Sequence, residues 1–219
     1  MHNYIDFHTH KQSAPKGVIT VYNQLLHEET GIPMHFYSAG LHPWYADKLS
    51  TAELSRALDL HGSSSNLIAL GETGLDKVCK MPIQLQQDIF ELQLNKAVIM
   101  SKPVIIHCVK AWEEMLEITS HYHVPMILHG YNGSDQLTVN LVKSGFFFSI
   151  GPMILNPNSR IGHAIQHIPP SSIFCETDES DQPIQSVYDA VSGYLKMKET
   201  DFRRTVMENF VRLRNESEA

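Results

Sequence analysis

The sequence is poor in cysteine and in basic residues, and each shortage excludes a class of protein. Its three cysteines, Cys79, Cys108 and Cys175, are odd in number and form no C-x-x-C pair. We therefore expect neither a disulfide framework nor a cysteine-ligated zinc site. With 17 Lys and Arg against 24 Asp and Glu, the formal net charge is −7, which argues against a broad basic surface that grips nucleic acid. An enzyme that takes a nucleic-acid end into a metal site remains compatible, because bound cations add positive charge.

Long apolar runs and a signal-peptide pattern are also missing. No run approaches the roughly 18 apolar residues that a membrane span needs. We therefore expect a cytoplasmic protein with no membrane association, and we predict no stable protein partner. The 219 residues, 42% hydrophobic and 19% charged, are typical of one globular domain over residues 1–219. The length also suits a compact α/β barrel.

Short β-branched apolar runs alternate with helical patterns along the chain, which is the signature of βα units. The expected strands are residues 4–7, 18–21, 36–39, 67–70, 104–106, 126–128, 146–150 and 173–175. The expected helices are residues 51–61, 83–100, 112–122, 134–143, 160–167, 184–196 and 200–214. Eight parallel strands close a barrel, so the predicted fold is an α/β (β/α)8 TIM barrel.

The first βα unit is irregular. Only residues 10–17, with Pro15 and Gly17 among them, separate the first two expected strands. A full crossover helix needs a dozen or more residues. We predict a slightly abridged barrel whose first outer helix is missing.

Metal-capable side chains stand at the carboxyl ends of five expected strands, where parallel barrels carry their functional groups. They are His8, His10, Glu72, His107, His129 and Asp178. His8 and His10 share one face because a strand has a side-chain period of two. Glu176 lies deeper on the face of Asp178, where we expect it to hydrogen-bond in the core rather than bind metal.

Imidazole and carboxylate ligands suit divalent ions such as Zn, Mn, Mg, Fe or Ni. Six protein ligands are too many for one catalytic ion with an open position, so they indicate two ions. Two ions a few ångströms apart can activate a water and clamp the attacking and leaving oxygens. The predicted reaction class is metal-assisted hydrolysis.

The same residues resemble the TatD-type metal-dependent deoxyribonucleases, a family of amidohydrolase-like barrels. The resemblance runs in order through these segments: DFHTH at 6–10, GLHP at 40–43, GETGLD at 71–76, KPVIIH at 102–107, HGYNGS at 129–134 and CETD at 175–178. It continues more weakly to residues 208–210 and so covers nearly the whole chain.

The resemblance implies a division of the ligands between two ions. His8, His10 and Asp178 would hold one ion, His107 and His129 the other, and Glu72 would bridge them. Asp178 has a second possible role as the base that takes a proton from water, and it and Glu72 are the predicted catalytic residues. The implied activity is hydrolysis of DNA phosphodiester bonds, of the 3′ exonuclease type, at a short or single-stranded DNA end.

Four further residues are predicted to contact the substrate: His42, Lys77, Lys110 and Tyr131. A structural turn is the rival interpretation for His42, and Asp76 is expected to orient a metal ligand. The chain departs from the family pattern at Val109, where relatives usually carry arginine. Glu179 and Asp181 also add negative charge near the expected mouth of the site.

Two other functions stay open. An amidohydrolase-like enzyme would use the same metals on a small amide, ester or phosphoester. A degenerate barrel kept as a binding module is disfavoured because no ligand position has been lost.

Overall fold

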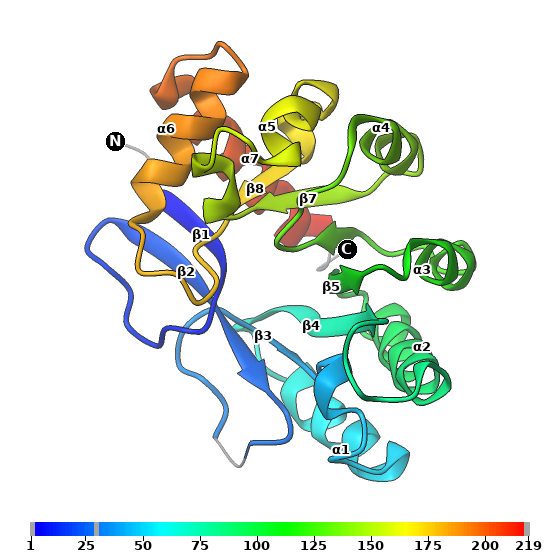
Figure 1. Ribbon diagram of the computed structural model, residues 1–219. Coiled ribbons are helices and arrows are strands. Elements are labelled where there is room, and N and C mark those ends of the chain that lie inside the picture. The colour runs from blue at the N-terminus through cyan, green and yellow to red at the C-terminus, as the bar shows by residue number, and fades with distance from the viewer. Residues whose placement is uncertain (1–2, 29–30, 217–219) are drawn as a thin grey trace. The chain divides into compact units, whose positions relative to one another are not determined.

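The computed structural model describes residues 3–28 and 31–216, in which strands and helices alternate (Figure 1). The strands are β1 (Tyr4–Thr9), β2 (Val18–Leu25), β3 (Tyr37–Gly40), β4 (Leu67–Asp76), β5 (Val104–Val109), β6 (Met126–Leu128), β7 (Phe147–Ile150) and β8 (Ile173–Cys175). The α-helices are α1 (Thr51–Gly62), α2 (Ile83–Ile99), α3 (Trp112–Thr119), α4 (Asp135–Lys143), α5 (Arg160–Ala164), α6 (Ile184–Tyr194) and α7 (Glu199–Glu216). Short 3-10 turns include η1 (Pro43–Tyr45) and η2 (Pro152–Leu155).

The chain divides into two compact units, and the prediction of a single domain over residues 1–219 stays a prediction. Of the described residues, unit 1 holds 3–22 and 127–216, and unit 2 holds 23–28 and 31–126. Among the helices that the structure describes, none combines the length and apolar character that crossing a bilayer requires.

In unit 1 the parallel strands pair as β6-β7-β8 and as β1-β2, and β1 lies beside β8, with a parallel bridge between Thr9 and Asp178. Helices α6 and α7 pack against β1 and β8 (Figure 1). The core centres on Phe7, whose ring stacks on Phe174 at 4.1 Å between centroids and meets Phe210 edge-on. The buried Tyr188 hydroxyl bonds both the amide and the carbonyl of Ile5, which ties α6 to the start of β1.

The connection between β1 and β2 contains no helix, as predicted. Residues 10–17 are irregular and end in a turn at Lys16 and Gly17, and the amide of Tyr4 donates to the carbonyl of Gly17 at 3.1 Å. Eight residues bring the chain back beside β1 without room for a crossover helix. The outer side of β1 and β2 therefore lacks the helix that follows most other strands.

In unit 2 the parallel order is β3-β4-β5, with α1 packed on α2 and α2 packed on β4. Ser50 is the N-cap of α1 and forms a capping box: Ser50 Oγ accepts from the Glu53 amide and Glu53 Oε2 accepts from the Ser50 amide. The buried Gln93 of α2 bonds both the amide and the carbonyl of Leu41, so it fixes the end of β3 to the helix layer.

Strands β4 and β5 are longer than their apolar runs indicate. β4 continues through Glu72 to Asp76, and β5 continues through His107. Gly71 and Gly74 permit this, because both have positive φ (129° and 137°) and a Cβ on either would collide with a β5 carbonyl. Polar residues expected just after these strands are thus held inside a paired ladder.

Candidate metal centre

In unit 2, one carboxylate oxygen of Glu72 lies between two imidazoles. Glu72 Oε1 is 3.1 Å from His42 Nε2 and 3.0 Å from His107 Nδ1. All three side chains are largely buried, and ligand atoms of the three lie within 4.8 Å of one another. Two imidazole nitrogens and a carboxylate oxygen are donors that divalent transition metals accept. This cluster fits a metal ion.

Asn23, at the end of β2, orients Glu72. Its Nδ2 donates to Glu72 Oε2 at 3.3 Å, and its Oδ1 accepts from the Glu72 amide at 3.1 Å. The Ser38 hydroxyl donates to the same Oδ1 and fixes the amide orientation. Because both ends of the Asn23 amide are engaged, the carboxylate keeps Oε1 directed at the imidazoles.

Asp76 lies beside His107, as expected for a residue that orients a ligand. Its Oδ2 is 3.4 Å from His107 Nε2 and accepts a 2.6 Å hydrogen bond from the Trp44 indole. Burial acts to raise the pKa of Asp76, but the hydrogen bonds from Trp44, the Val78 amide and His107 outweigh it and lower the pKa overall. An ionised Asp76 accepts a hydrogen bond from the Nε2–H of His107 and leaves Nδ1 as the nitrogen that can bind a metal.

In unit 1, His8, His10 and Asp178 come together at the end of β1. Asp178 Oδ1 is 3.8 Å from His8 Nε2 and 3.4 Å from His10 Nε2. The backbone holds this contact: the Asp178 amide donates to the His8 carbonyl, and the His10 amide donates to the Asp178 carbonyl. Asp178 itself has a φ of 53°, a left-handed conformation that turns its side chain away from the strand direction.

His129 also belongs to unit 1, and its ring lies 4.5 Å from that of His8 between centroids. Its Nδ1 is 3.5 Å from Glu176 Oε1, which accepts a 2.6 Å hydrogen bond from the Gly130 amide. Glu176 is fully buried. The prediction that Glu176 hydrogen-bonds in the core is confirmed.

The four residues expected to contact substrate have different surroundings. His42 touches Glu72 with Nε2, while its Nδ1 accepts from the Trp44 amide and caps η1. His42 thus both contacts Glu72 and stabilises a turn, so both interpretations of this residue hold, and it becomes a further candidate metal ligand.

The other three predicted substrate contacts are not part of this cluster. Lys77 pairs with Glu114 at 2.5 Å, and Lys110 is exposed just after β5. Tyr131 is buried with its hydroxyl bonded to Thr138 at 2.7 Å. Its substrate contact, like those of the lysines, stays a prediction.

Sequence reasoning missed three residues that organise these clusters: Asn23, Trp44 as the partner of Asp76, and Asp6, whose carboxylate accepts hydrogen bonds from Thr177 beside Asp178. Asn23 and Asp6 are polar residues in or beside apolar β-branched runs, a signal that could have identified them as buried hydrogen-bonding groups. The Trp44–Asp76 pair left no such signal, because 32 residues separate its members.

Parallel strands whose carboxyl ends carry imidazoles and carboxylates are typical of metal-dependent barrel hydrolases. The model of the family "TatD related DNase" matches residues 18–215. The chain belongs to this family. The resemblance noted in the sequence is thereby confirmed.

Two curated relatives illustrate the family. The uncharacterized metal-dependent hydrolase BU355 of Buchnera aphidicola subsp. Acyrthosiphon pisum is 31% identical over 153 residues, which are 65% of this chain and 58% of that protein. The human 3′-5′ RNA nuclease TATDN2 is 33% identical over 147 residues, 64% of this chain and 19% of that protein. The matched region thus spans less than two thirds of either relative.

The crystal structure of YjjV, a TatD homologue from Escherichia coli K12, has the same fold. The TM-score is 0.81 at 22% identity, over 96% of this chain and 97% of that chain. The predicted (β/α)8 barrel class is confirmed by this likeness together with the eight strands in chain order.

Proposed function

We propose that this chain is a metal-dependent hydrolase of nucleic-acid phosphodiester bonds that removes nucleotides from the 3′ end of single-stranded DNA. The observation that carries the proposal is Glu72, buried between His42 and His107 and held from behind by Asn23. A buried carboxylate in contact with two imidazoles is costly to maintain unless a cation or protons compensate its charge.

We propose that each of the two clusters supplies ligands for divalent ions, two ions in all. His8, His10, His129 and Asp178 are the proposed ligands in unit 1, and His42, Glu72 and His107 in unit 2. The assignment of each ligand to one ion stays a prediction. When bound, such ions polarise a phosphoryl oxygen and lower the pKa of a bound water.

The chain's own residues would orient the metal ligands, accept a proton and contact the phosphate. Asp76 and Asn23 set the direction of His107 and Glu72, and Asp178 is the proposed proton acceptor. Lys110 follows β5, is exposed, and has no ion-pair partner among the described residues, so it can approach a phosphate. It stands beside Val109, where the family's arginine is absent.

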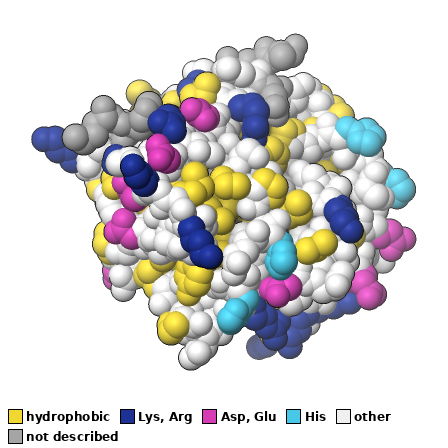
Figure 2. Space-filling view, turned by 90° about the horizontal axis from the view of Figure 1, so that it is seen from above, with side chains coloured by type: hydrophobic (Ala, Val, Ile, Leu, Met, Phe, Trp, Pro, Cys, Tyr) yellow, Lys and Arg dark blue, Asp and Glu magenta, His cyan; other side chains and the backbone are white. Residues whose placement is uncertain are grey.

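An enzyme that acts on the end of a nucleic acid does not need a surface that binds the rest of the strand tightly. The net charge is −7, and on the face drawn in Figure 2 basic side chains are interspersed with acidic and uncharged ones. Near the end of β1, Lys11 pairs with Asp181 at 2.7 Å and offsets part of the acidic charge there. Such a surface favours a short end over a long duplex.

The decisive experiment is hydrolysis of a 5′-labelled single-stranded oligonucleotide by the full chain in Mg, Mn and Zn. We expect a ladder that shortens from the 3′ end and disappears with chelator. Glu72→Gln should abolish cleavage and lower the bound metal found by elemental analysis. Glu117→Gln, an exposed position on α3, is the matched control and should behave like the parent.

Other outcomes separate the alternatives. A chain that binds no metal would exclude any metal-dependent hydrolase. Metal binding with cleavage of small amides, esters or phosphoesters but not of DNA would support the amidohydrolase-like alternative instead.

A further inference from the structure

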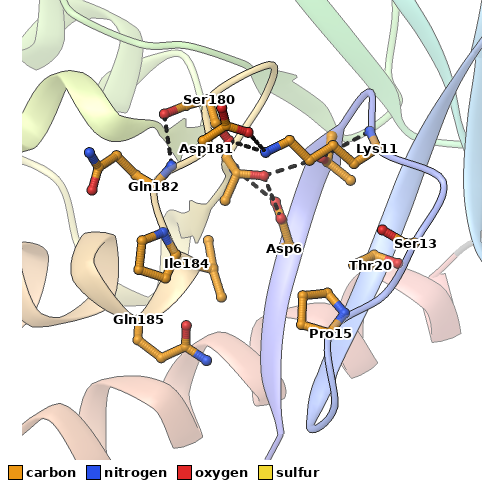
Figure 3. Close-up of a pocket in the computed structure, with 13 residues that line it drawn as sticks. Asp6, Lys11, Ser13, Pro15, Thr20, Ser180, Asp181, Gln182, Ile184 and Gln185 are labelled. Atoms are coloured by element: carbon orange, nitrogen blue, oxygen red, sulfur yellow. Dashed lines mark hydrogen bonds and ion pairs between the residues drawn. The ribbon is translucent and has the colours of Figure 1, made fainter.

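A pocket opens in unit 1 where β1 and β2 lack an intervening helix. Its volume is about 290 Å³. One wall comes from the turn after β1, and the other from the segment that leads from β8 into α6 (Figure 3). A helix between β1 and β2 covers this side in a complete βα unit, so its absence is what leaves the cavity.

The pocket and the metal-ligand candidates lie on opposite faces of β1. The β1–β2 register shifts between Asp6 and Thr9, because three steps along β1 match two steps, Thr20 to Tyr22, along β2. This bulge lets Asp6 and Thr9 line the same pocket although they are three positions apart, an offset that places residues of a regular strand on opposite faces. His8 and His10 flank Thr9 and therefore point to the other face. The pocket is distinct from the candidate metal centre.

The polar groups of the pocket are arranged to bind hydroxyl groups. At its base, Asp6 is 5% exposed and accepts one hydrogen bond at each oxygen from Thr177, at 2.9 and 2.6 Å. A carboxylate has about four acceptor sites, so two remain. Around it stand side chains for which the described part of the structure records no hydrogen bond: Ser13, Thr20, Gln182 and Gln185.

Apolar side chains complete the lining. Pro15 stands on one wall and Ile184 on the other (Figure 3), and Pro183, next to Ile184 in the chain, is also part of the lining. Rigid apolar surfaces opposite a set of hydroxyl and amide groups fit a ring that is apolar on its faces and polar at its edge.

The charges of the pocket disfavour an anion. Lys11 Nζ is already engaged, at 2.7 Å from both Asp181 Oδ1 and the Ser180 carbonyl. The lining therefore holds one cation against two carboxyl groups, those of Asp6 and Asp181. A phosphate would have to displace Asp181 from Lys11 and face both carboxyl groups.

We propose that this pocket binds a neutral sugar ring, either free or as the sugar of a nucleoside. Ring hydroxyls donate to Asp6 and exchange hydrogen bonds with Thr20 and the amides of Gln182 and Gln185, while the ring faces pack on Pro15 and Pro183. The proposal does not require nuclease activity, because the pocket lies on the face of β1 away from the metal ligands.

The test is a ligand titration of the full chain, with binding measured by saturation-transfer NMR. EDTA is present so that binding at a metal ion does not contribute to the signal. The probes are ribose, glucose and thymidine, with ribose 5-phosphate as the charged comparison. We expect at least one of the three neutral probes to bind more tightly than ribose 5-phosphate. The double variant Thr20→Val/Gln185→Met should weaken its binding about tenfold, since two neutral hydrogen bonds are lost.

The control is Gln136→Met, an exposed position on α4 outside the pocket, which should leave binding unchanged. Circular dichroism confirms that each variant is folded. The proposal is overturned if no neutral probe binds at millimolar concentration, if the double variant binds like the parent, or if ribose 5-phosphate binds tightest. Preference between thymidine and the free sugars identifies the source of the ring.

Discussion

The carboxylate of Asp6 accepts two hydrogen bonds from one residue, Thr177: one from its amide at 2.9 Å and one from its hydroxyl at 2.6 Å. Thr177 immediately precedes Asp178, and its hydroxyl also lies 3.1 Å from that of Thr9, which donates to the Asp178 carbonyl. The buried side chain of Asp6 thus fixes the backbone that presents Asp178.

Asp6→Ala should destabilise the chain and weaken metal binding together. It leaves the Thr177 amide and hydroxyl without their acceptor, at a cost of about 2–3 kcal/mol in the free energy of unfolding. Urea unfolding measures the stability, and calorimetric titration with Mn or Zn measures the affinity. Asp47→Ala, at an exposed position, is the control. An Asp6→Ala protein with parental metal affinity would disprove the link to Asp178.

Asn23→Ala should lower metal affinity although the chain still carries the ligand Glu72. Without Asn23, Glu72 Oε2 loses the donor at 3.3 Å and the carboxylate can rotate away from His42 and His107. Loss of such an orienting partner costs roughly 10–100-fold in metal affinity. Metal titration of Asn23→Ala beside Asn158→Ala, whose side chain is exposed, measures the effect. Equal affinities in the two variants would contradict the orienting role.

Two glycine-to-alanine substitutions should change stability in opposite directions. At Gly74, φ is 137° and a Cβ would meet the carbonyl of His107, so Gly74→Ala should destabilise unit 2 by more than about 1 kcal/mol. At Gly193, near the end of α6, no atom lies within 4 Å of the added Cβ. Gly193→Ala should therefore stabilise by about 0.4–1 kcal/mol. Urea midpoints distinguish the two, and destabilisation by Gly193→Ala would be inconsistent with its open surroundings.

The stability of the chain should depend on His61 at mildly acidic pH. Burial of its ring lowers the pKa of His61 below 6.5, and its Nδ1 lies 3.1 Å from the Tyr37 hydroxyl. As the pH falls below 6.5 the unfolded chain takes up this proton more readily than the folded chain, so stability is lost; above that pH the contribution is fully present.

The measurement is the free energy of unfolding at pH 7.5 and pH 5.5 for the parent and for His61→Gln. The parent should lose more stability between the two conditions than the variant does. His121→Gln, at an exposed position, should reproduce the parent's pH response. If His61→Gln loses as much stability between pH 7.5 and pH 5.5 as the parent does, His61 is not the cause of the pH dependence.

Much of the fold was predictable because it depends on local patterns. Apolar β-branched runs followed by amphipathic segments placed every strand and most helix boundaries, and the short link from residue 10 to residue 17 excluded the first helix. The capping box at Ser50 and Glu53 depends only on residues three apart. The prediction of a helix over residues 160–167 was less accurate, because this segment is α-helical only to Ala164 and continues as a 3-10 turn.

Strand period and parallel topology, which can be inferred from the sequence, predicted histidines and carboxylates at the strand ends as candidate metal ligands. The folded structure was needed to show which nitrogen of each histidine faces a carboxylate, that His42 contacts Glu72, and that Asn23 and Asp76 orient the cluster. It also decided that a bulge in β1 directs Asp6 and Thr9 into a separate pocket. These relations join residues tens of positions apart, and side-chain direction depends on packing that no local pattern encodes.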